Sequence, residues 1–410
     1  MARILIVSSA HLSRNPRVVK EATSLAQVGH EVEVLTISNY PPAEELDRAL
    51  LAQAPFRRTT IDFLRPGPVA RSASLVRRLH TRLAREAVRL LHHESPWSLG
   101  PAGPLLRQAL ARPADLTIVH NELPAWIGVR LLWAGRRVAA DLEDWYSEDL
   151  LPSDRRSRPL RLLRLVEGTL LRQAAYTSVP SAVLAAALAE QYWAPIPLVL
   201  TNAAWLQPAP LRSPAGPHGP RLVWFSQTIG PGRGLEEFLG IWSRTLPPSR
   251  ITLVGGAHPA YRDQLLAAVP PPLRSRVFFQ ELVPPDQLPA LLAQHDVGLA
   301  LEPATPRNKD LAVSNKILQY LNAGLAVLAT ATAGQREVLA EAAGAGEFID
   351  LHSPATAHEL LDGLLADDAR LQAMQRAARV AAARRFCWEC EAPKLVAAVA
   401  AALTAIPRPL

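Results

Sequence analysis

Cysteine, lysine and long apolar runs are all scarce in this 410-residue sequence. The two cysteines, Cys387 and Cys390, exclude a disulfide framework. Their C-x-x-C spacing has no second ligand pair, which favours two reduced thiols over a zinc or redox site. No stretch reaches the roughly 18 uninterrupted apolar residues of a membrane-spanning helix, and Ile4–Val7 is too short for a signal-peptide core. We therefore expect a cytoplasmic protein.

The composition is that of a folded chain, with 49% hydrophobic and 20% charged residues. The length predicts two hydrophobic cores. The net charge is +7, nearly all of the basic residues are arginine, and residues 1–205 carry most of the excess. Such an excess is compatible with nucleic acid, an anionic membrane surface or acidic substrates. Aromatic residues are not interleaved with the arginines as base stacking requires, so we expect no nucleic-acid partner.

The first half alternates strand and helix patterns. Short apolar runs predict strands at 3–9, 31–37, 115–120 and 137–141, with helical patterns ending near Gly29 and Ala134. The last of these strands leads into an acidic loop. Repeated strand–helix–strand units predict an open parallel α/β domain.

The segment 206–220 has five prolines and two glycines, which predicts a linker. After it, strands at 222–226, 251–254, 277–279, 297–301 and 326–330 alternate with helical segments, and the chain beyond Pro354 reads as helical. We expect an N-terminal domain at 1–205, a second domain at 221–385 and a helix at 386–410 that packs back on the first domain. Parallel sheets that face each other across an interdomain cleft would place the active site in that cleft.

The loop 229–236, Ile-Gly-Pro-Gly-Arg-Gly-Leu-Glu, lies between a predicted strand and a predicted helix. Gly232 and Gly234 allow backbone amides to approach a ligand, and Arg233 adds a cation suited to phosphate oxygens. This pattern indicates an anion site. A plain glycine-rich turn with an exposed arginine stays open, because the spacing is not the dinucleotide-binding fingerprint.

A second strand–helix junction, Ser314-Asn315-Lys316, opens an amphipathic helix. Ser314 or Asn315 is a suitable N-cap. Lys316 in the first turn adds positive charge where the helix dipole is already positive, which costs stability unless an anion lies there. We interpret this conflict as a sign of a bound phosphate.

Together with residues 3–37 and 314–330, these loops resemble the retaining glycosyltransferases of family four. The resemblance implies the GT-B architecture of two Rossmann-like domains. It also implies sugar transfer from a nucleotide diphosphate sugar to a glycan, lipid-linked or small-molecule hydroxyl, as in the biosynthesis of cell-surface polysaccharides. It requires neither a metal nor another cofactor. Open alternatives are a nucleotide-sugar 2-epimerase of the same architecture and a catalytically idle nucleotide-sugar-binding subunit; a dinucleotide oxidoreductase is a weaker one.

The resemblance also assigns donor-side residues. The residues that would hold the donor diphosphate are Gly232, Arg233, Gly234, Ser314, Asn315 and Lys316. The family often has two glutamates eight positions apart, and these positions are Leu311 and Gln319 here. Gln319 can hydrogen-bond a ribose hydroxyl, but Leu311 cannot replace a carboxylate. Candidates for the missing sugar contact are Glu302, Asn308 and Asp310.

In the first half, Glu143 and Asp144 follow a strand and resemble the family's cluster facing the reacting sugar. With His120 they are the candidate catalytic residues, because they can hold hydroxyl groups or accept a proton. A solvated acidic loop and a structural histidine are the alternatives. Strand-end loops also provide Asn15, Arg17 and Asn121 as candidate acceptor ligands.

Two arginine-rich helices are predicted, around 75–92 and 155–172. In the first, the leucines at 75, 79, 83 and 90 share one face, and the arginines at 78, 82, 85 and 89 line another. This pattern suits peripheral attachment to the inner face of an anionic membrane, where lipid-linked acceptors reside. An ordinary surface helix is the alternative, and the same two interpretations apply to the second helix, whose leucines occupy its inner positions.

Overall fold

The computed structural model describes residues 1–64, 68–152, 154–208 and 219–405 and divides the chain into two compact units. Unit 1 comprises Met1–Leu200 and Ala392–Leu410, and unit 2 comprises Thr201–Glu391. Of the predicted linker, residues 209–218 lie outside the described part of the chain, and the flanking residues belong to unit 2.

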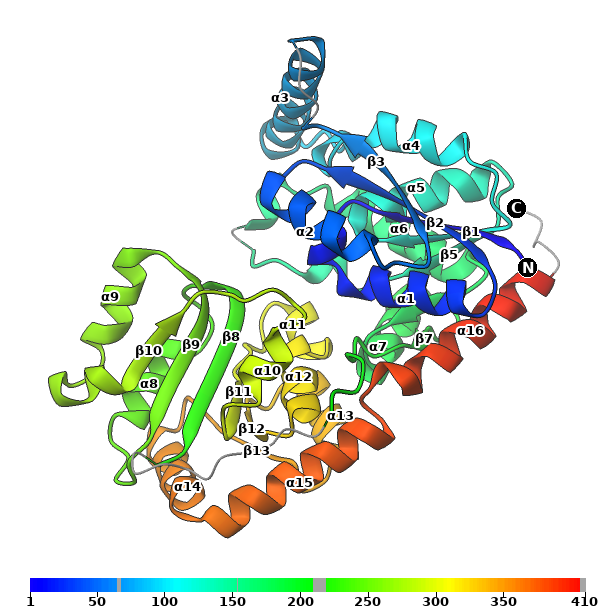
Figure 1. Cartoon of the computed structure of the whole chain (residues 1–410). Helices are drawn as coiled ribbons and strands as arrows, with labels where there is room; N and C mark the ends of the chain where they lie inside the picture. Colours follow the sequence, from blue (N-terminus) through cyan, green and yellow to red (C-terminus); the bar gives the residue numbers. More distant parts are fainter. Residues whose placement is uncertain (65–67, 153, 209–218, 406–410) are drawn as a thin grey trace. The chain divides into compact units, whose positions relative to one another are not determined.

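Unit 1 contains a parallel sheet whose described strands follow the order β3-β2-β1-β4-β5-β6-β7 (Figure 1). Its strands are β1 (Arg3–Ser8), β2 (Glu31–Ser38), β3 (Arg57–Asp62), β4 (Leu116–His120), β5 (Val138–Asp141), β6 (Thr177–Val179) and β7 (Leu198–Val199). Its helices are α1 (Pro16–Gln27), α2 (Pro41–Leu51), α3 (Pro68–Leu91), α4 (Ala102–Leu110), α5 (Glu122–Trp133), α6 (Leu160–Gln173) and α7 (Ala182–Tyr192). Short 3-10 turns are η1 (Leu12–Arg14), η2 (Pro96–Ser98), η3 (Tyr146–Glu148) and η4 (Asp154–Ser157).

The central strands of unit 1 end in a row of polar residues. Along β1 and β4 the apolar side chains are buried on both faces, as expected for a parallel sheet covered by helices. Ser8, His120, Asp141 and Ser178 are partners in register at the carboxyl ends of neighbouring strands. The sheet therefore brings residues that are far apart in the sequence to one edge, where open parallel sheets bind ligands.

Unit 2 has a second parallel sheet, whose described strands follow the order β10-β9-β8-β11-β12-β13. Its strands are β8 (Arg221–Ile229), β9 (Arg250–Ala257), β10 (Val277–Gln280), β11 (Val297–Ala300), β12 (Ala326–Ala329) and β13 (Gly346–Phe348). Its helices are α8 (Leu235–Trp242), α9 (Pro259–Ala267), η5 (Pro271–Arg276), α10 (Leu288–Leu292), α11 (Arg307–Leu311), α12 (Asn315–Ala323), α13 (Ala333–Glu341), α14 (Pro354–Ala366) and α15 (Asp368–Arg384). The last helix, α16 (Trp388–Thr404), begins in unit 2 and continues into unit 1.

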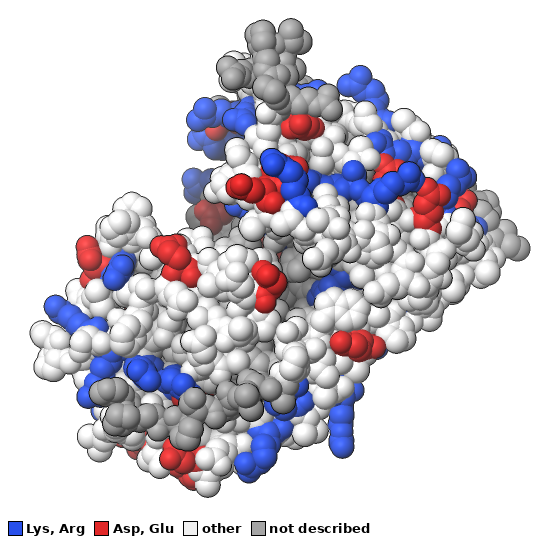
Figure 2. Space-filling view, viewed as in Figure 1, with Lys and Arg blue, Asp and Glu red and all other residues white. Residues whose placement is uncertain are grey.

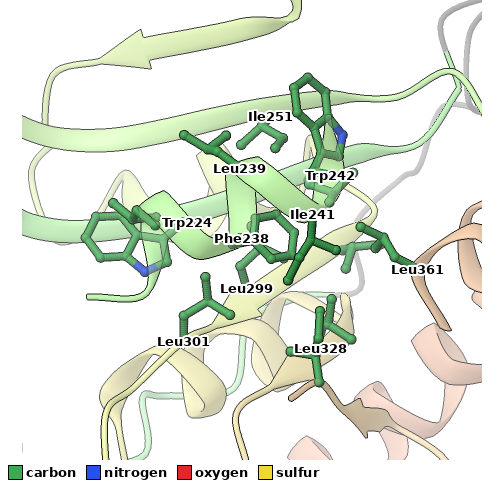
Figure 3. Close-up of a cluster of buried hydrophobic side chains, with 14 of the residues drawn as sticks. Trp224, Phe238, Leu239, Ile241, Trp242, Ile251, Leu299, Leu301, Leu328 and Leu361 are labelled. Carbon is green, nitrogen blue, oxygen red and sulfur yellow. The ribbon is translucent and has the colours of Figure 1, made fainter. Parts of the chain in front are cut away.

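Large apolar side chains fix the helices of unit 2 against its sheet. Figure 3 shows Trp224, Phe238 and Trp242 among the leucines and isoleucines of this core. On the other face, Tyr320 of α12 packs against Gly298 of β11, where an added Cβ would lie 2.2 Å from the ring. The Tyr320 hydroxyl donates to the Leu299 carbonyl at 3.2 Å. These contacts hold the start of α12 in a fixed place relative to the ends of the strands.

The two parallel α/β units confirm the predicted fold class. The two cysteines are both free thiols, and their Sγ atoms lie 3.4 Å apart. Among the helices of the described ranges, none has the length and apolar content needed to cross a membrane.

Candidate functional site

A pocket of about 520 Å³ lies at the carboxyl ends of the strands of unit 2. Its lining comes from the segments after β8, β11, β12 and β13, because parallel strands all end at the same edge. The lining residues that carry polar or charged side chains are Arg233, Glu237, Glu302, Thr330, Thr332, Arg336, Asp350 and His352. This is the position at which ligands bind in open α/β sheets.

The loop after β8 requires glycine at two positions. Gly232 has a φ of 72° and Gly234 a φ of 71°, a region that side chains with a Cβ rarely adopt. A Cβ on Gly234 would also lie 2.7 Å from Leu351. Gly234 is the N-cap of α8, and the half-buried Arg233 has no hydrogen bond or ion pair to any residue in the described ranges. The loop therefore presents an uncommitted guanidinium and a helix N-terminus to the pocket.

Lys316 forms a buried ion pair with Glu302. Its Nζ lies 2.5 Å from Glu302 Oε1 and 5.3 Å from the centre of the Trp224 ring. Ser314 Oγ caps α12 by accepting from the Lys316 amide at 3.2 Å and donates to Glu302 Oε1 at 2.9 Å. Burial lowers the pKa of Lys316, with Glu302 opposing. Burial works to raise the pKa of Glu302, but the Lys316 ammonium outweighs it and the pKa is lowered.

This pair changes the interpretation of the α12 junction. The positive charge at the start of the helix is compensated by Glu302, a residue of the chain, so it does not by itself require a bound phosphate. Glu302 nevertheless lines the pocket, and its pairing brings the start of α12 to the pocket edge.

The remaining predicted donor residues do not line this pocket. Asn315 Oδ1 accepts from Asn202 Nδ2 at 2.9 Å, and Asp310 Oδ1 accepts from the Ala333 amide at 3.0 Å, at the start of α13. Asn308 is fully buried, and Gln319 is half-buried on α12.

The sequence analysis missed Arg336, which lines the pocket from the first turns of α13. Its guanidinium packs over Phe348, 5.2 Å from the ring centre, and its Nε donates to the Ala331 carbonyl. The sequence could have indicated Arg336 as a candidate, because it follows the strand predicted at 326–330 by a few residues, as Arg233 follows the strand before it.

A larger hollow of about 770 Å³ includes Arg221 and Arg250, the first residues of β8 and β9. It therefore reaches the amino ends of these strands, away from the edge where ligands of parallel sheets bind. The smaller pocket is therefore the better candidate for a ligand site.

In unit 1 the predicted residues converge on a buried network of charges. Arg17 Nε donates to Asp141 Oδ2, and its Nη1 donates to the Leu200 carbonyl at 2.7 Å. His120 lies between two carboxylates, with Nε2 3.1 Å from Glu21 and Nδ1 3.0 Å from Glu143. Arg17, Glu21, His120 and Asp141 are each at most 1% exposed. Arg17 and His120 are thus committed to partners inside the unit.

The buried charges shift one another's pKa values. Burial works against the charged form of His120, but Glu21 and Glu143 outweigh it and raise its pKa to about 10. Burial opposes ionisation of Glu21, but His120 prevails and lowers that pKa to about 2. For Asp141 burial dominates and raises the pKa to about 7, with Arg17 opposing. His120 is therefore a cation at neutral pH.

Glu143 is the half-exposed end of this network. Its Oε1 accepts from Asn15 Nδ2 at 2.7 Å, from His120 at 3.0 Å and from Asn121 Nδ2 at 3.4 Å. Asn121 adopts a φ of 68° and accepts from Ser8 Oγ at 2.9 Å. Three contacts on one oxygen hold the carboxylate of Glu143 in place. Asp144, the neighbouring candidate, is half-buried.

Two groups in unit 1 have the residue types and proximity of metal ligands. One is Glu21, His120 and Asp141; the other is His11, Glu44 and Asp47. Arg17 pairs with Asp141 in the first, and Arg58 lies 3.0 Å from both carboxylates in the second. These guanidiniums supply the positive charge that a metal would otherwise bring.

Helix α3 presents its large apolar side chains to solvent. Leu75, Leu79 and Leu83 are 67%, 53% and 58% exposed, and Val76, Leu90 and Leu91 are also exposed. The small residues Ser74 and Ala84, together with Val88, form its buried side. The leucine stripe of α3 is therefore exposed. In α6, by contrast, Leu163, Leu170 and Leu171 are buried, as their inner positions predicted.

Two family models match the sequence. Residues 15–204 match a glycosyl transferase 4-like domain, and residues 233–397 match a glycosyl transferase-like domain. No protein of curated function matches in a direct sequence comparison.

Solved structures with the same fold are distant in sequence. Anabaena HepE in complex with UDP is 15% identical, with a TM-score of 0.70 over 98% of this chain and 100% of HepE. Sucrose-phosphate synthase from Thermosynechococcus elongatus is 15% identical, with a TM-score of 0.68 over 98% of both chains. A mutant of S. aureus TarM, in complex with Fondaparinux, alpha-GlcNAc-glycerol and UDP, is 9% identical, with a TM-score of 0.67 over 99% of this chain and 100% of TarM.

Proposed function

This chain belongs to glycosyltransferase family four, and we propose that it transfers a sugar from a UDP-sugar to a hydroxyl group of its acceptor, with retention of anomeric configuration. The observation that carries the proposal is the pocket of unit 2, where an uncommitted arginine and a glycine-capped helix start lie at the ends of parallel strands. The choice of UDP is supported by HepE, which has been solved with UDP and with UDP-glucose, and by TarM with UDP.

The main chemical task is to stabilise the departing diphosphate. The uncommitted guanidinium of Arg233 and the amides at the start of α8 would donate to the phosphate oxygens and neutralise the charge that develops on them. The Lys316–Glu302 pair lies beside them. In the front-face mechanism usually proposed for retaining enzymes of this type, a leaving phosphate oxygen takes the acceptor proton, and no covalent nucleophile is required.

In unit 1 we assign Glu143 to the acceptor side. Its carboxylate is held by Asn15, His120 and Asn121 and can accept a hydrogen bond from an acceptor hydroxyl. His120 has no exposed surface, so its part is to orient Glu143 rather than to touch the substrate.

The donor assignment is tested by thermal unfolding with UDP, GDP, ADP and dTDP, each added to the wild-type chain and to Arg233→Ala. We expect UDP to raise the melting temperature of the wild type and to do so much less in Arg233→Ala, because ligand binding stabilises the folded state by mass action. Arg276→Ala, an exposed arginine outside the pocket, is the matched control. An equal shift in wild type and Arg233→Ala would refute the proposed site, and a shift with another base alone would refute UDP.

We further propose that α3 attaches unit 1 to an anionic membrane surface, where a lipid-linked acceptor would reside. The support is the exposed leucine stripe bordered by arginines (Figure 2 shows basic side chains around α3 at the top of the view). Such a helix buries its apolar face at the lipid headgroups while its cations contact anionic lipid.

A further inference from the structure

A pocket of about 470 Å³ lies within unit 1, apart from the two hollows of unit 2. Ser9 follows β1, Asn39 follows β2 and Phe63 follows β3, so it lies at the carboxyl ends of three parallel strands. Its opposite wall is α3, and Leu99–Pro101 close one side. The pocket is large enough for a phosphorylated sugar, since ligand pockets run from about 300 to 1,000 Å³.

Four arginines of α3 line this pocket, and none of its described lining residues is acidic. Arg85 Nε donates to the Ser98 carbonyl at 2.9 Å, and the Arg77 guanidinium packs over Phe63, 5.2 Å from the ring centre. These two are oriented by the protein. Arg78 and Arg82 make no hydrogen bond or ion pair within the described part of the chain.

The arginines of α3 place like charges close together on one wall of the pocket. Arg78 and Arg82 are four residues apart on one helix face, an arrangement in which equal charges destabilise the helix. Planar guanidinium groups match phosphate oxygens through paired hydrogen bonds. An arginine cluster with no carboxylate on the wall is therefore suited to a phosphate group.

The pocket adjoins the candidate acceptor carboxylate. Ser8, the residue before Ser9, donates to Asn121, which in turn donates to Glu143. The end of β1 thus has Glu143 on one side and the arginine pocket on the other.

We infer that this pocket binds a phosphate group carried by the acceptor, so that the substrate class is a phosphorylated glycan or sugar. The assignment of this pocket to the acceptor rests on the proposed transfer function. The binding test is independent of that function, because it measures phosphate binding to unit 1 rather than turnover.

The test is a titration with glycerol 3-phosphate in solution and with phosphatidylcholine vesicles that contain phosphatidic acid, which carries the same phosphomonoester. The variant is Arg78→Ser/Arg82→Ser, and Arg89→Ser is the control, since Arg89 lies on the same helix outside the pocket and pairs with Glu86. Arg233→Ala removes the competing anion site of unit 2. Each titration is made alongside a UDP titration.

We expect the double variant to lose about tenfold or more in affinity for the phosphomonoester, while Arg89→Ser and Arg233→Ala retain that affinity. UDP binding should be unchanged in the double variant and in Arg89→Ser, and weakened only in Arg233→Ala. Loss for both probes supports the pocket as a phosphomonoester site. Loss for the vesicles alone would count against the pocket, because the proposed membrane attachment of α3 already explains it. Equal loss in Arg89→Ser, or loss in Arg233→Ala only, would overturn the inference. If UDP does not bind the wild type, the proposed function is contradicted. The phosphomonoester affinities would still test the arginine pocket, because they do not depend on UDP.

Discussion

Lys316 and Glu302 are both buried, so removing one should cost more than removing both. Lys316→Met leaves the Glu302 carboxylate without its counter-ion, and we expect it to lower the free energy of unfolding by about 3 kcal/mol. In Lys316→Met/Glu302→Gln neither charge is left unpaired, and we expect a smaller loss. Urea unfolding of the two single variants and the double variant measures this coupling. A double variant whose loss equals the sum of the single losses would show that the pair is not coupled.

His120 predicts a pH dependence of stability. Its pKa is raised to about 10 in the folded state, so its stabilisation is complete below about pH 6.5, the value of a free histidine, and is lost as the pH rises toward 10. We expect the free energy of unfolding to fall by up to about 1.4 kcal/mol for each unit between about pH 7 and pH 9. Urea unfolding at several pH values measures the slope.

The control for this prediction is His120→Gln, which is less stable but has no imidazolium to lose. Its slope over the same range should be shallower than that of the wild type. The raised pKa of Asp141 contributes in the same direction at lower pH, because its ionisation up to about pH 7 is less favourable in the folded state. Equal slopes in variant and wild type would contradict the role given to His120.

At the scale of a single element, α3 predicts binding to anionic lipid. Leu79→Glu/Leu83→Glu places two carboxylates in the exposed leucine stripe and should reduce co-sedimentation with vesicles of phosphatidylcholine and phosphatidylglycerol by about tenfold or more, through lost apolar burial and added repulsion. Leu246→Glu, which changes a more exposed leucine of unit 2, is the matched control. Equal loss in the control, or none in the α3 variant, would exclude α3 as the attachment site.

The elements differ in how far the sequence predicts them. Apolar runs with helical segments between them located the central strands, and the glycines around Arg233 located the loop of the donor pocket. The inward face of α3 could not be predicted, because periodicity places leucines on one stripe without saying which stripe meets the protein. Here Ser74, Ala84 and Val88 form the contact instead.

The sequence does not predict the ion pair of Lys316 with Glu302 for a different reason. The two residues are fourteen positions apart, with α11 between them, and the packing of α12 on β11 brings their segments together. The same holds for Glu21, His120 and Glu143, which come from α1, β4 and the loop after β5. The sequence shows which polar residues follow each strand, but it does not show which of them form ion pairs or hydrogen bonds with one another.

At the scale of the whole molecule, the C-terminal residues belong to the N-terminal unit. Truncation after Glu391 removes the buried Leu395 and Val399 of α16 and should lower the stability of unit 1 by about 3 kcal/mol or more. The pocket residues of unit 2 all remain, so UDP should still raise the melting temperature of one transition. Calorimetry with and without UDP measures both effects. Loss of the UDP effect, or an unchanged unit 1, would contradict this division.

This division also bears on how the chain is made. A ribosome that adds residues from the N-terminus releases all of unit 2 before it releases Ala392–Leu410. Domains commonly fold in the order of their synthesis, but here the first unit to begin is the last to be complete. Until synthesis ends, unit 1 lacks the α16 residues that belong to it, including the buried Leu395 and Val399.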